Sequence, residues 1–228
     1  MDGNGRWATN RNLPRLKGHE AGIETVKEIV RACPELEVST LTLFAFAISN
    51  WKRDKIEVDG LWSLFHIFFT QHIQELVSEG IKIKIIGSRG QLSKEILRDI
   101  EKAEEDSKNN SKFLLQVALN YDGIDEVARM VQNAINGNIP VGEITPAYIQ
   151  SHLDTMPGND PDIIIRTGMP KAEQGMSVWR SSSFLPLQSV ESVCVSTEVL
   201  WPDITPQHIQ KIITFAKVDE RLFGGQRK

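Results

Sequence analysis

Short apolar segments alternate along this chain with longer segments of helical periodicity. Such alternation favours an α/β fold with a mainly parallel central sheet flanked by helices. No repeat or linker divides the 228 residues, so residues 1–228 are expected to form a single domain. Strands are expected at Thr40–Phe46, Ile81–Ile86, Phe113–Asn120, Asp162–Arg166 and Val190–Ser196. Helices are expected at His19–Cys33, Glu57–Ser78, Ser93–Ser107, Asp125–Ile135, Thr145–Leu153 and Pro206–Leu222.

The overall composition narrows the class of partner. Hydrophobic residues make up 40% and charged residues 25% of the chain, which is ordinary for a globular protein with a sizeable core. The net charge of −4 gives no general attraction to nucleic acid, yet several arginines lie in or beside short motifs. Local basic charge on an acidic protein suits a small anionic substrate better than a polymer.

The sequence predicts neither a membrane-spanning helix nor a disulfide framework. No segment reaches the roughly 18 apolar residues of a spanning helix, and no signal peptide is visible. Cys33 and Cys194 are too few for a disulfide framework or a zinc site, and both fall in apolar patterns that predict core packing. We therefore expect a cytoplasmic location.

The amino-terminal residues combine groups suited to a diphosphate and a divalent cation. An acid, two glycines and an arginine occur in the run Asp2-Gly3-Asn4-Gly5-Arg6. Glycines let backbone N–H groups approach phosphate oxygens, Arg6 can grip them in a fork, and Asp2 is an oxygen ligand suited to Mg²⁺. Arg15 and His19 add donors near the next helix. Taken alone, Asp-Gly and Asn-Gly also predict an ordinary surface turn.

Further motifs follow the opening run, Met1 to Ala8, in a fixed order along almost the whole chain. They are Gly18-His19-x-Ala21-Gly22, Leu41-Thr42-Leu43-Phe44-Ala45-Phe46, Asn50-Trp51-Lys52-Arg53, Glu57-Val58, Ala118-Leu119-Asn120-Tyr121, Asp160-Pro161-Asp162, Ile165-Arg166-Thr167, Leu200-Trp201-Pro202-Asp203 and Phe223-Gly224-Gly225. With these blocks the chain resembles the cis-prenyltransferases, the family of undecaprenyl and dehydrodolichyl diphosphate synthases. An ordered series of blocks is a more specific signal than any one motif.

The resemblance implies prenyl transfer between an allylic diphosphate and isopentenyl diphosphate, giving a Z-polyprenyl diphosphate. It implies Mg²⁺ as the cofactor and a homodimer, with a hetero-oligomer as the alternative. It also implies peripheral association with a membrane through the product, and no nucleic-acid partner. Two other functions stay open: irregular condensation of two allylic units, and a non-catalytic subunit of a cis-prenyltransferase complex.

The resemblance also implies the site residues, by their positions in the motifs. Asp2 resembles the catalytic aspartate that binds Mg²⁺, and Asn50 resembles a catalytic residue between the two substrates. The allylic diphosphate cradle would be Gly3, Asn4, Gly5, Arg6, Arg15 and His19, with Trp7, Trp51 and Arg53 as further substrate contacts. Isopentenyl diphosphate would be bound by Arg166, Arg180 and Ser182.

The chain also departs from the family pattern. The family has a buried first strand that leads into the Asp-Gly-Asn turn, and this strand is missing from the chain as given. Either the amino terminus is incomplete or the protein lacks the strand, and we expect an incomplete amino terminus. Other departures lie within the motifs. Ala47-Ile48-Ser49 replaces the usual Ser-Thr-Glu before Asn-Trp, and an insertion over residues 168–179 separates the two predicted isopentenyl-site arginines. Val193 stands where many bacterial members have a metal-supporting glutamate. These departures indicate altered substrate handling.

The helix expected over Glu57–Ser78 is unusually rich in large aromatic side chains. It carries Trp62, Phe65, Phe68 and Phe69 at helical spacing. Ordinary core packing would explain this pattern. A wall of the hydrocarbon tunnel that the family has in this region would explain it equally, so both interpretations stay open.

Overall fold

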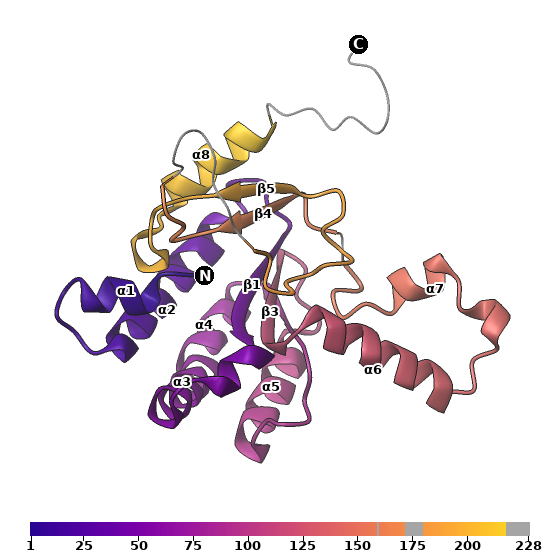
Figure 1. Cartoon of the computed structure of the whole chain (residues 1–228). Helices are drawn as coiled ribbons and strands as arrows, with labels where there is room; N and C mark the ends of the chain where they lie inside the picture. Colours follow the sequence, from indigo (N-terminus) through magenta and orange to yellow (C-terminus); the bar gives the residue numbers. More distant parts are fainter. Residues whose placement is uncertain (159, 172–179, 218–228) are drawn as a thin grey trace, which may run out of the picture.

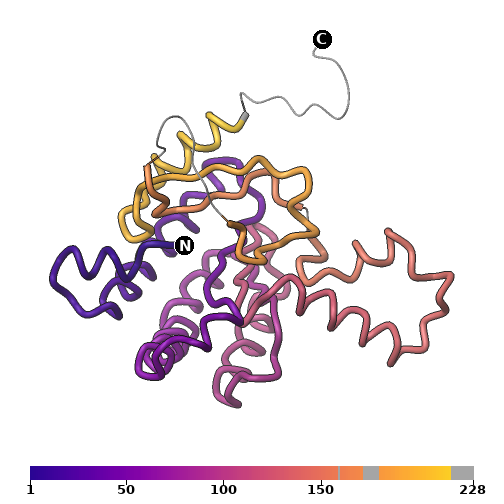
Figure 2. The backbone as a smooth tube through the Cα atoms, in the orientation of Figure 1, coloured from indigo at the N-terminus to yellow at the C-terminus, as the bar shows by residue number. Residues whose placement is uncertain are grey.

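The predicted α/β class is confirmed. The computed structural model describes residues 1–158, 160–171 and 180–217, and all strand pairs within them are parallel. Figure 1 shows the strands in the middle of the molecule, with helices on both sides of them. Helices α6 and α7 extend away from this body as an arm, which the tube in Figure 2 follows clearly.

The five strands fall close to the expected segments. They are β1 (Thr40–Ala47), β2 (Ile81–Ile86), β3 (Phe113–Tyr121), β4 (Ile163–Arg166) and β5 (Val193–Ser196). The eight helices in the described part of the chain are α1 (Asn4–Thr9), α2 (Arg15–Ala32), α3 (Lys55–Ile67), α4 (Ile73–Ser78), α5 (Lys94–Ser107), α6 (Gly123–Asn136), α7 (Pro146–Ser151) and α8 (Pro206–Lys217). The expected end of the last helix, at Leu222, lies outside the described residues.

Three helices differ from the expected ones. Residues expected to form a turn make α1, whose N-cap Gly3 has a φ of 115°, a conformation that favours glycine. α2 begins at Arg15, four residues earlier than expected. The helix expected over Glu57–Ser78 is divided into α3 and α4 by the π-helical turn Phe68–His72. A π turn contains an extra residue, which explains why the consecutive Phe68 and Phe69 are both buried.

Strand β3 lies at the centre of the core. It is buried without interruption from Leu115 to Tyr121, as is typical of a parallel strand covered on both faces. Side-chain caps fix where two flanking helices begin, because Ser93 accepts from Ile96 N before α5 and Asp122 accepts from Ile124 N before α6.

One cysteine differs from its expected packing. Cys33 is buried in the core as predicted, whereas Cys194 is exposed. β5 pairs with β4 on one side only among the described residues, so part of its surface stays open. None of the helices in this part of the chain is long and apolar enough to cross a bilayer.

The parallel strands form two sheets and not one continuous sheet. The first has the order β1-β3-β2 and the second pairs β4 with β5. A cavity of about 1220 Å³ lies between them, and consecutive residues of β1 and of β4 line it, so strand edges open onto it. Met1 also lines this cavity.

Close packing of α1 on α2 generates a stability prediction. A Cβ atom at Gly18 would lie 1.9 Å from the carbonyl oxygen of Asn4, a backbone atom that cannot move aside cheaply. Gly18→Ala should therefore lower the free energy of unfolding by about 1–3 kcal/mol. Gly142→Ala is the matched control, because no atom lies within 4 Å of its Cβ position. Equal stability of the two variants in denaturant unfolding would contradict the prediction.

Candidate active site

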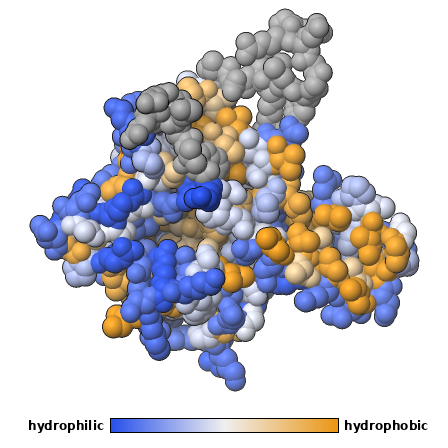
Figure 3. All heavy atoms as spheres, in the orientation of Figure 1, coloured by the Kyte–Doolittle hydropathy of each residue, from blue (hydrophilic) through white to orange (hydrophobic). Residues whose placement is uncertain are grey.

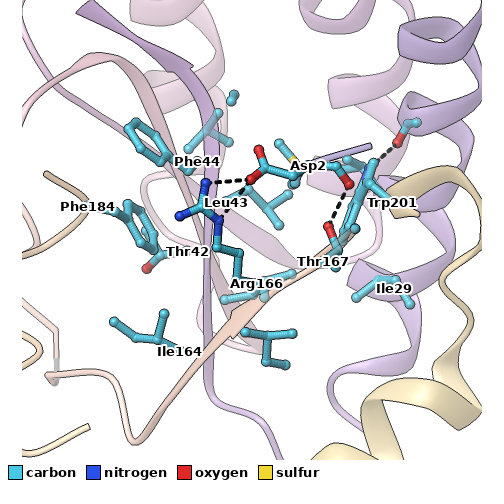
Figure 4. Close-up of a pocket in the computed structure, with 18 of the residues that line it drawn as sticks. Asp2, Ile29, Thr42, Leu43, Phe44, Ile164, Arg166, Thr167, Phe184 and Trp201 are labelled. Atoms are coloured by element: carbon cyan, nitrogen blue, oxygen red, sulfur yellow. Dashed lines mark hydrogen bonds and ion pairs between the residues drawn. The ribbon is translucent and has the colours of Figure 1, made fainter. Parts of the chain in front are cut away.

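The carboxylate of Asp2 lies at the carboxyl end of β4, opposite an arginine. Arg166 Nε and Nη2 each lie 2.9 Å from Asp2 Oδ2. Figure 4 shows the two side chains meeting at the edge of the cavity. The Asp2 side chain is 49% exposed, so water screens the pair, and other charges can replace it at little cost in stability.

The backbone of Asp2 is held as firmly as its side chain. Its carbonyl oxygen accepts from Thr167 Oγ1 at 2.9 Å and from Trp201 N at 3.0 Å. Arg6 donates to the carbonyl of Gly168. A Cβ atom at Gly168, where φ is 64°, would lie 2.9 Å from the backbone carbonyl oxygen of Asp2, so this close approach requires glycine. The opening residues are thus docked onto the end of β4.

Arg15 of the predicted cradle and Arg53, predicted as a further substrate contact, gather around one carboxylate. Glu57 accepts from Arg15 Nε at 3.2 Å and from Arg53 Nη1 at 3.0 Å. Desolvation alone would raise the pKa of Glu57, but the hydrogen bonds and charges of Arg15 and Arg53 outweigh it and lower the pKa. An internal anion therefore holds these two cations together.

His19 lies beside the same group of charges as a neutral imidazole. Burial, followed by the charge of Arg53, lowers the pKa of His19 to about 4. Its Nε2 atom is buried without a hydrogen-bond partner and lies 4.0 Å from Glu57 Oε1. A buried unpaired ring nitrogen at a cavity wall is free to bond a ligand oxygen.

Asn50 and Trp51 lie on a short 3₁₀ helix, Ile48–Lys52, directly after β1. Asn50 lines the cavity, and its Oδ1 accepts from Ala47 N at 3.0 Å. Trp51 donates from Nε1 to Asn120 Oδ1 at 2.8 Å and stacks on Trp62. No role was predicted for Asn120, although a buried amide in an apolar strand was the available signal.

The two tryptophans predicted as substrate contacts do not line the cavity. Trp7 donates from Nε1 to Asp203 Oδ1 at 2.7 Å, and the Arg11 guanidinium lies 4.1 Å from its ring centre. Trp51 is likewise absent from the lining among the described residues. Each therefore supports neighbouring structure in this geometry.

The remaining predicted isopentenyl-site residues open onto the same cavity as Arg166. Arg180 and Ser182 both line it, next to Phe184, which stacks on Phe44 with ring centres 4.8 Å apart. The residues after Phe184 are anchored by Gln188, which donates to the buried carboxylate of Glu126. Of the predicted insertion 168–179, residues 172–179 lie outside the described residues.

The lining of the cavity is polar in one part and apolar in another. The opening residues, the start of α2 and the end of β4 contribute charged and polar groups to the lining, whereas most of the lining side chains from the rest of α2, from α3 and from β1 are apolar. Phe65, Phe68 and Phe69 line the apolar part, and Trp62 is not among the lining residues. The aromatic helix is therefore part core and part cavity wall.

Comparisons with known proteins agree with this geometry over nearly the whole chain. The prenyltransferase family model for undecaprenyl diphosphate synthase matches residues 1–224. An isoprenyl transferase of Bacillus anthracis is 37% identical over 229 residues, covering 99% of this chain and 86% of its own length. One of Agrobacterium fabrum is 38% identical, covering 98% and 89%.

The chain belongs to the undecaprenyl diphosphate synthase family. Like that family, it is a prenyltransferase that makes a cis-polyprenyl diphosphate.

Two solved structures support the assignment. The crystal structure of lavandulyl diphosphate synthase from Lavandula x intermedia, in complex with dimethylallyl diphosphate, matches with a TM-score of 0.88 and 27% identity. It covers 99% of this chain and 95% of the other. A probable undecaprenyl diphosphate synthase from Campylobacter jejuni matches with a TM-score of 0.78 and 27% identity, covering 90% and 93%.

The donor set of this prenyltransferase fits a single Mg²⁺ site. Among the described residues no three His, Cys, Asp or Glu side chains gather as metal ligands. One carboxylate, that of Asp2, is nevertheless sufficient, because Mg²⁺ completes its shell with water and substrate phosphate oxygens. Val193, which stands where many bacterial members have a metal-supporting glutamate, pairs with Ile163 at the start of β4. Ile163 lies three positions before Arg166, so Val193 lies roughly 10 Å along the strand from that arginine.

The shifted pKa of His19 predicts a pH dependence of stability. The unfolded chain binds a proton near pH 6.5 and the folded chain only near pH 4, so the unfolded state holds more protons between these values. The free energy of unfolding should therefore rise with pH across this window, by at most about 3 kcal/mol. His19→Gln should lose that part of the slope in denaturant titrations. An NMR titration of His19 centred near pH 6.5 would contradict the assignment.

Proposed function

We propose that Asp2 binds Mg²⁺ and that the cations around it form two diphosphate sites on either side. Gly3, Asn4, Gly5, Arg6, Arg15 and His19 bind the allylic diphosphate, with Asn50 and Arg53 beside it. Arg166, Arg180 and Ser182 bind isopentenyl diphosphate. The observation that carries this proposal is the position of Asp2, which contacts Arg166 with its carboxylate and belongs to the same run as Arg6.

The protein's own residues act mainly by stabilising charge that develops on the leaving diphosphate. Arg6 and Arg15 are fixed cations near one end of the cavity, and such preorganised charges lower the barrier most when water is excluded. His19 is neutral at pH 7, so it acts as a hydrogen-bond donor to a phosphate oxygen and not as a cation. When bound, Mg²⁺ supplies further Lewis-acid stabilisation of the diphosphate oxygens.

The apolar interior of the cavity has a separate task in this proposal. The transferred carbon skeleton carries positive charge in the transition state, and water would quench it. The walls contributed by α2, α3 and β1 exclude water and accept the growing hydrocarbon chain. A long hydrocarbon product favours a membrane, so we infer that the protein works in the cytoplasm at a membrane surface.

Irregular condensation of two allylic units is a second candidate. Ala47-Ile48-Ser49 places no carboxylate immediately before Asn50, at the mouth of the cavity. The identity of 37–38% to isoprenyl transferases favours the regular reaction. Mass analysis of products formed from dimethylallyl diphosphate alone separates the two, because the regular reaction yields nothing without isopentenyl diphosphate.

Retention of the catalytic groups disfavours a purely non-catalytic subunit.

The partner that best fits the surface is a second copy of this chain. Ile124, Ala128, Val131 and Ile135 form an exposed stripe along α6, which we call the α6 stripe. Figure 3 shows apolar atoms gathered over this arm. Beside the stripe, Arg129 is paired with Asp125 and with Asp154, so its charge is compensated within the protomer.

The spacing of the α6 stripe is symmetric about its middle. Two antiparallel copies related by a two-fold axis would therefore place Ile124 against Ile135, and Ala128 against Val131. A two-fold interface requires such self-complementarity, and exposed apolar patches of this kind mark association sites. We therefore propose a homodimer through α6.

The role of Asp2 predicts a specific loss of turnover. Asp2→Ala should lower the rate of labelled isopentenyl diphosphate incorporation by about 10³-fold, because it removes the metal ligand. The melting temperature should change little, since the side chain is half exposed. Asp59→Ala, which removes an exposed acid paired with Lys55 on α3, is the control. Near-normal incorporation by Asp2→Ala would overturn the proposed function.

The aromatic cavity wall predicts a change in product length. Shrinking Phe65, Phe68 or Phe69 to Ala should open the cavity and lengthen the product by five-carbon units if one of them forms its floor. Trp62→Ala is the control, because its ring packs on Phe46 and Trp51 outside the lining. That change should cost about 3–5 kcal/mol of stability and leave product length alone. If the three phenylalanine variants also leave product length unchanged, these rings serve only as ordinary core packing.

The α6 stripe predicts the oligomeric state. Ile135→Glu places a charge opposite an apolar surface of the second copy, so it should shift the protein from dimer to monomer in sedimentation equilibrium. Asn133→Glu, on another face of the same helix, should leave the dimer intact. A dimer that survives Ile135→Glu, or a wild type that is monomeric, would contradict the proposal.

A further inference from the structure

Thr167 belongs to a matched motif but has no part in the proposed chemistry. It directly follows Arg166 at the end of β4 and is only 2% exposed. Three consecutive residues here contact the opening residues: Arg166 bonds the Asp2 carboxylate, Thr167 bonds the Asp2 carbonyl, and the Gly168 carbonyl accepts from Arg6. Thr167 is the middle contact, and Figure 4 shows it beneath Asp2.

The Asp2 carbonyl has two donors, and only one of them is a side chain. Trp201 N donates at 3.0 Å and Thr167 Oγ1 at 2.9 Å, so both lone pairs of the oxygen are used. Two bonds from different directions fix the orientation of the peptide plane. The orientation of this plane in turn restricts where the Asp2 carboxylate can lie, because only the Cα–C bond and two side-chain bonds separate the carbonyl from the carboxylate.

The hydroxyl of Thr167 is not needed to keep β4 in place. Neighbouring backbone groups already tie the end of β4 to the segment after β5, through Thr197 N to Arg166 O at 2.9 Å and Gly168 N to Val199 O at 2.8 Å. These bonds persist when the hydroxyl is removed. The Thr167 hydroxyl therefore acts on Asp2 more than on the strand.

We propose that Thr167 is a positioning residue, whose hydroxyl fixes the Asp2 carbonyl and so aims the Asp2 carboxylate at the point where Mg²⁺ and the substrate diphosphates meet. This inference rests on the proposed role of Asp2 as the metal ligand. Catalytic groups must be held within about 0.5 Å of their productive positions, and small displacements cost up to roughly 10²-fold in rate. The hydroxyl supplies that restraint at a residue near the start of the chain.

Thr167→Val tests the proposal, because it removes the hydroxyl while keeping the shape of the side chain. It should lower kcat by about 10–10²-fold and raise the Mg²⁺ concentration for half-maximal rate about tenfold. Binding of an unreactive thiolo analogue of dimethylallyl diphosphate, measured by calorimetry, should weaken in the presence of Mg²⁺ and stay unchanged in its absence. Thr167→Ser keeps the hydroxyl and should restore all three measurements.

Thr25→Val is the matched control. Thr25 is also buried, and its hydroxyl donates to a backbone carbonyl, that of Pro202, at 3.2 Å. Both valine variants should lose similar stability, but only Thr167→Val should change the Mg²⁺ dependence. If Thr167→Val does not fold, Thr167→Ala takes its place with the same expected results.

The outcomes separate this inference from the proposed function. Wild-type Mg²⁺ dependence in Thr167→Val, or an equal change in Thr25→Val, overturns the positioning role. If Asp2→Ala is inactive while Thr167→Val is normal, only the inference fails. If Asp2→Ala itself keeps normal turnover, the proposed function fails first.

Discussion

The docking of the opening residues onto the end of β4 is the contact on which the rest of the site depends. Asp2 and Arg166 are separated by 164 positions in the sequence, yet their side chains meet at 2.9 Å. This contact brings the predicted metal ligand and the two proposed diphosphate sites to one end of the cavity. Because Gly18 and Gly168 allow the backbone to approach closely on either side, the docking depends on shape as much as on charge.

Carboxylates of the protein itself hold the cationic side chains of the site in place. Glu57 keeps Arg15 and Arg53 together, and Asp2 keeps Arg166 in place. A diphosphate that enters meets cations already gathered, so little of its binding energy is used to collect them. It must also compete with the resident carboxylates, which favours ligands of higher negative charge.

The elements were predictable from sequence where one local pattern decided them. The segments of β2 and β3 lie where the apolar patterns placed them, and the helix expected over Ser93–Ser107 is present as α5. α1 was missed because six residues that include a glycine carry no helical periodicity. The π-helical turn Phe68–His72 was missed because its extra residue per turn changes how the side chains pack, but the sequence still reads as helix-forming.

The chemistry of residues 2–6 already indicated a diphosphate and a divalent cation, but the rest of the candidate site was predictable only through the resemblance. Chain positions far apart meet there, and no local pattern reports such contacts. The resemblance named Asp2 and Arg166 but not the contact between them. It also placed Trp7 and Trp51 among substrate contacts, whereas here their indole N–H groups bond Asp203 and Asn120.

The division of the strands into two sheets has a mechanical consequence. Ladder hydrogen bonds make a continuous sheet stiff against widening, and no such ladder joins β1 to β4 among the described residues. Among these residues, the end of β4 is instead linked to the rest of the molecule through its contacts with the opening residues, from Arg166 and Thr167 to Asp2 and from Arg6 to the Gly168 carbonyl. Loss of those contacts would loosen the end of β4 relative to α1 and α2.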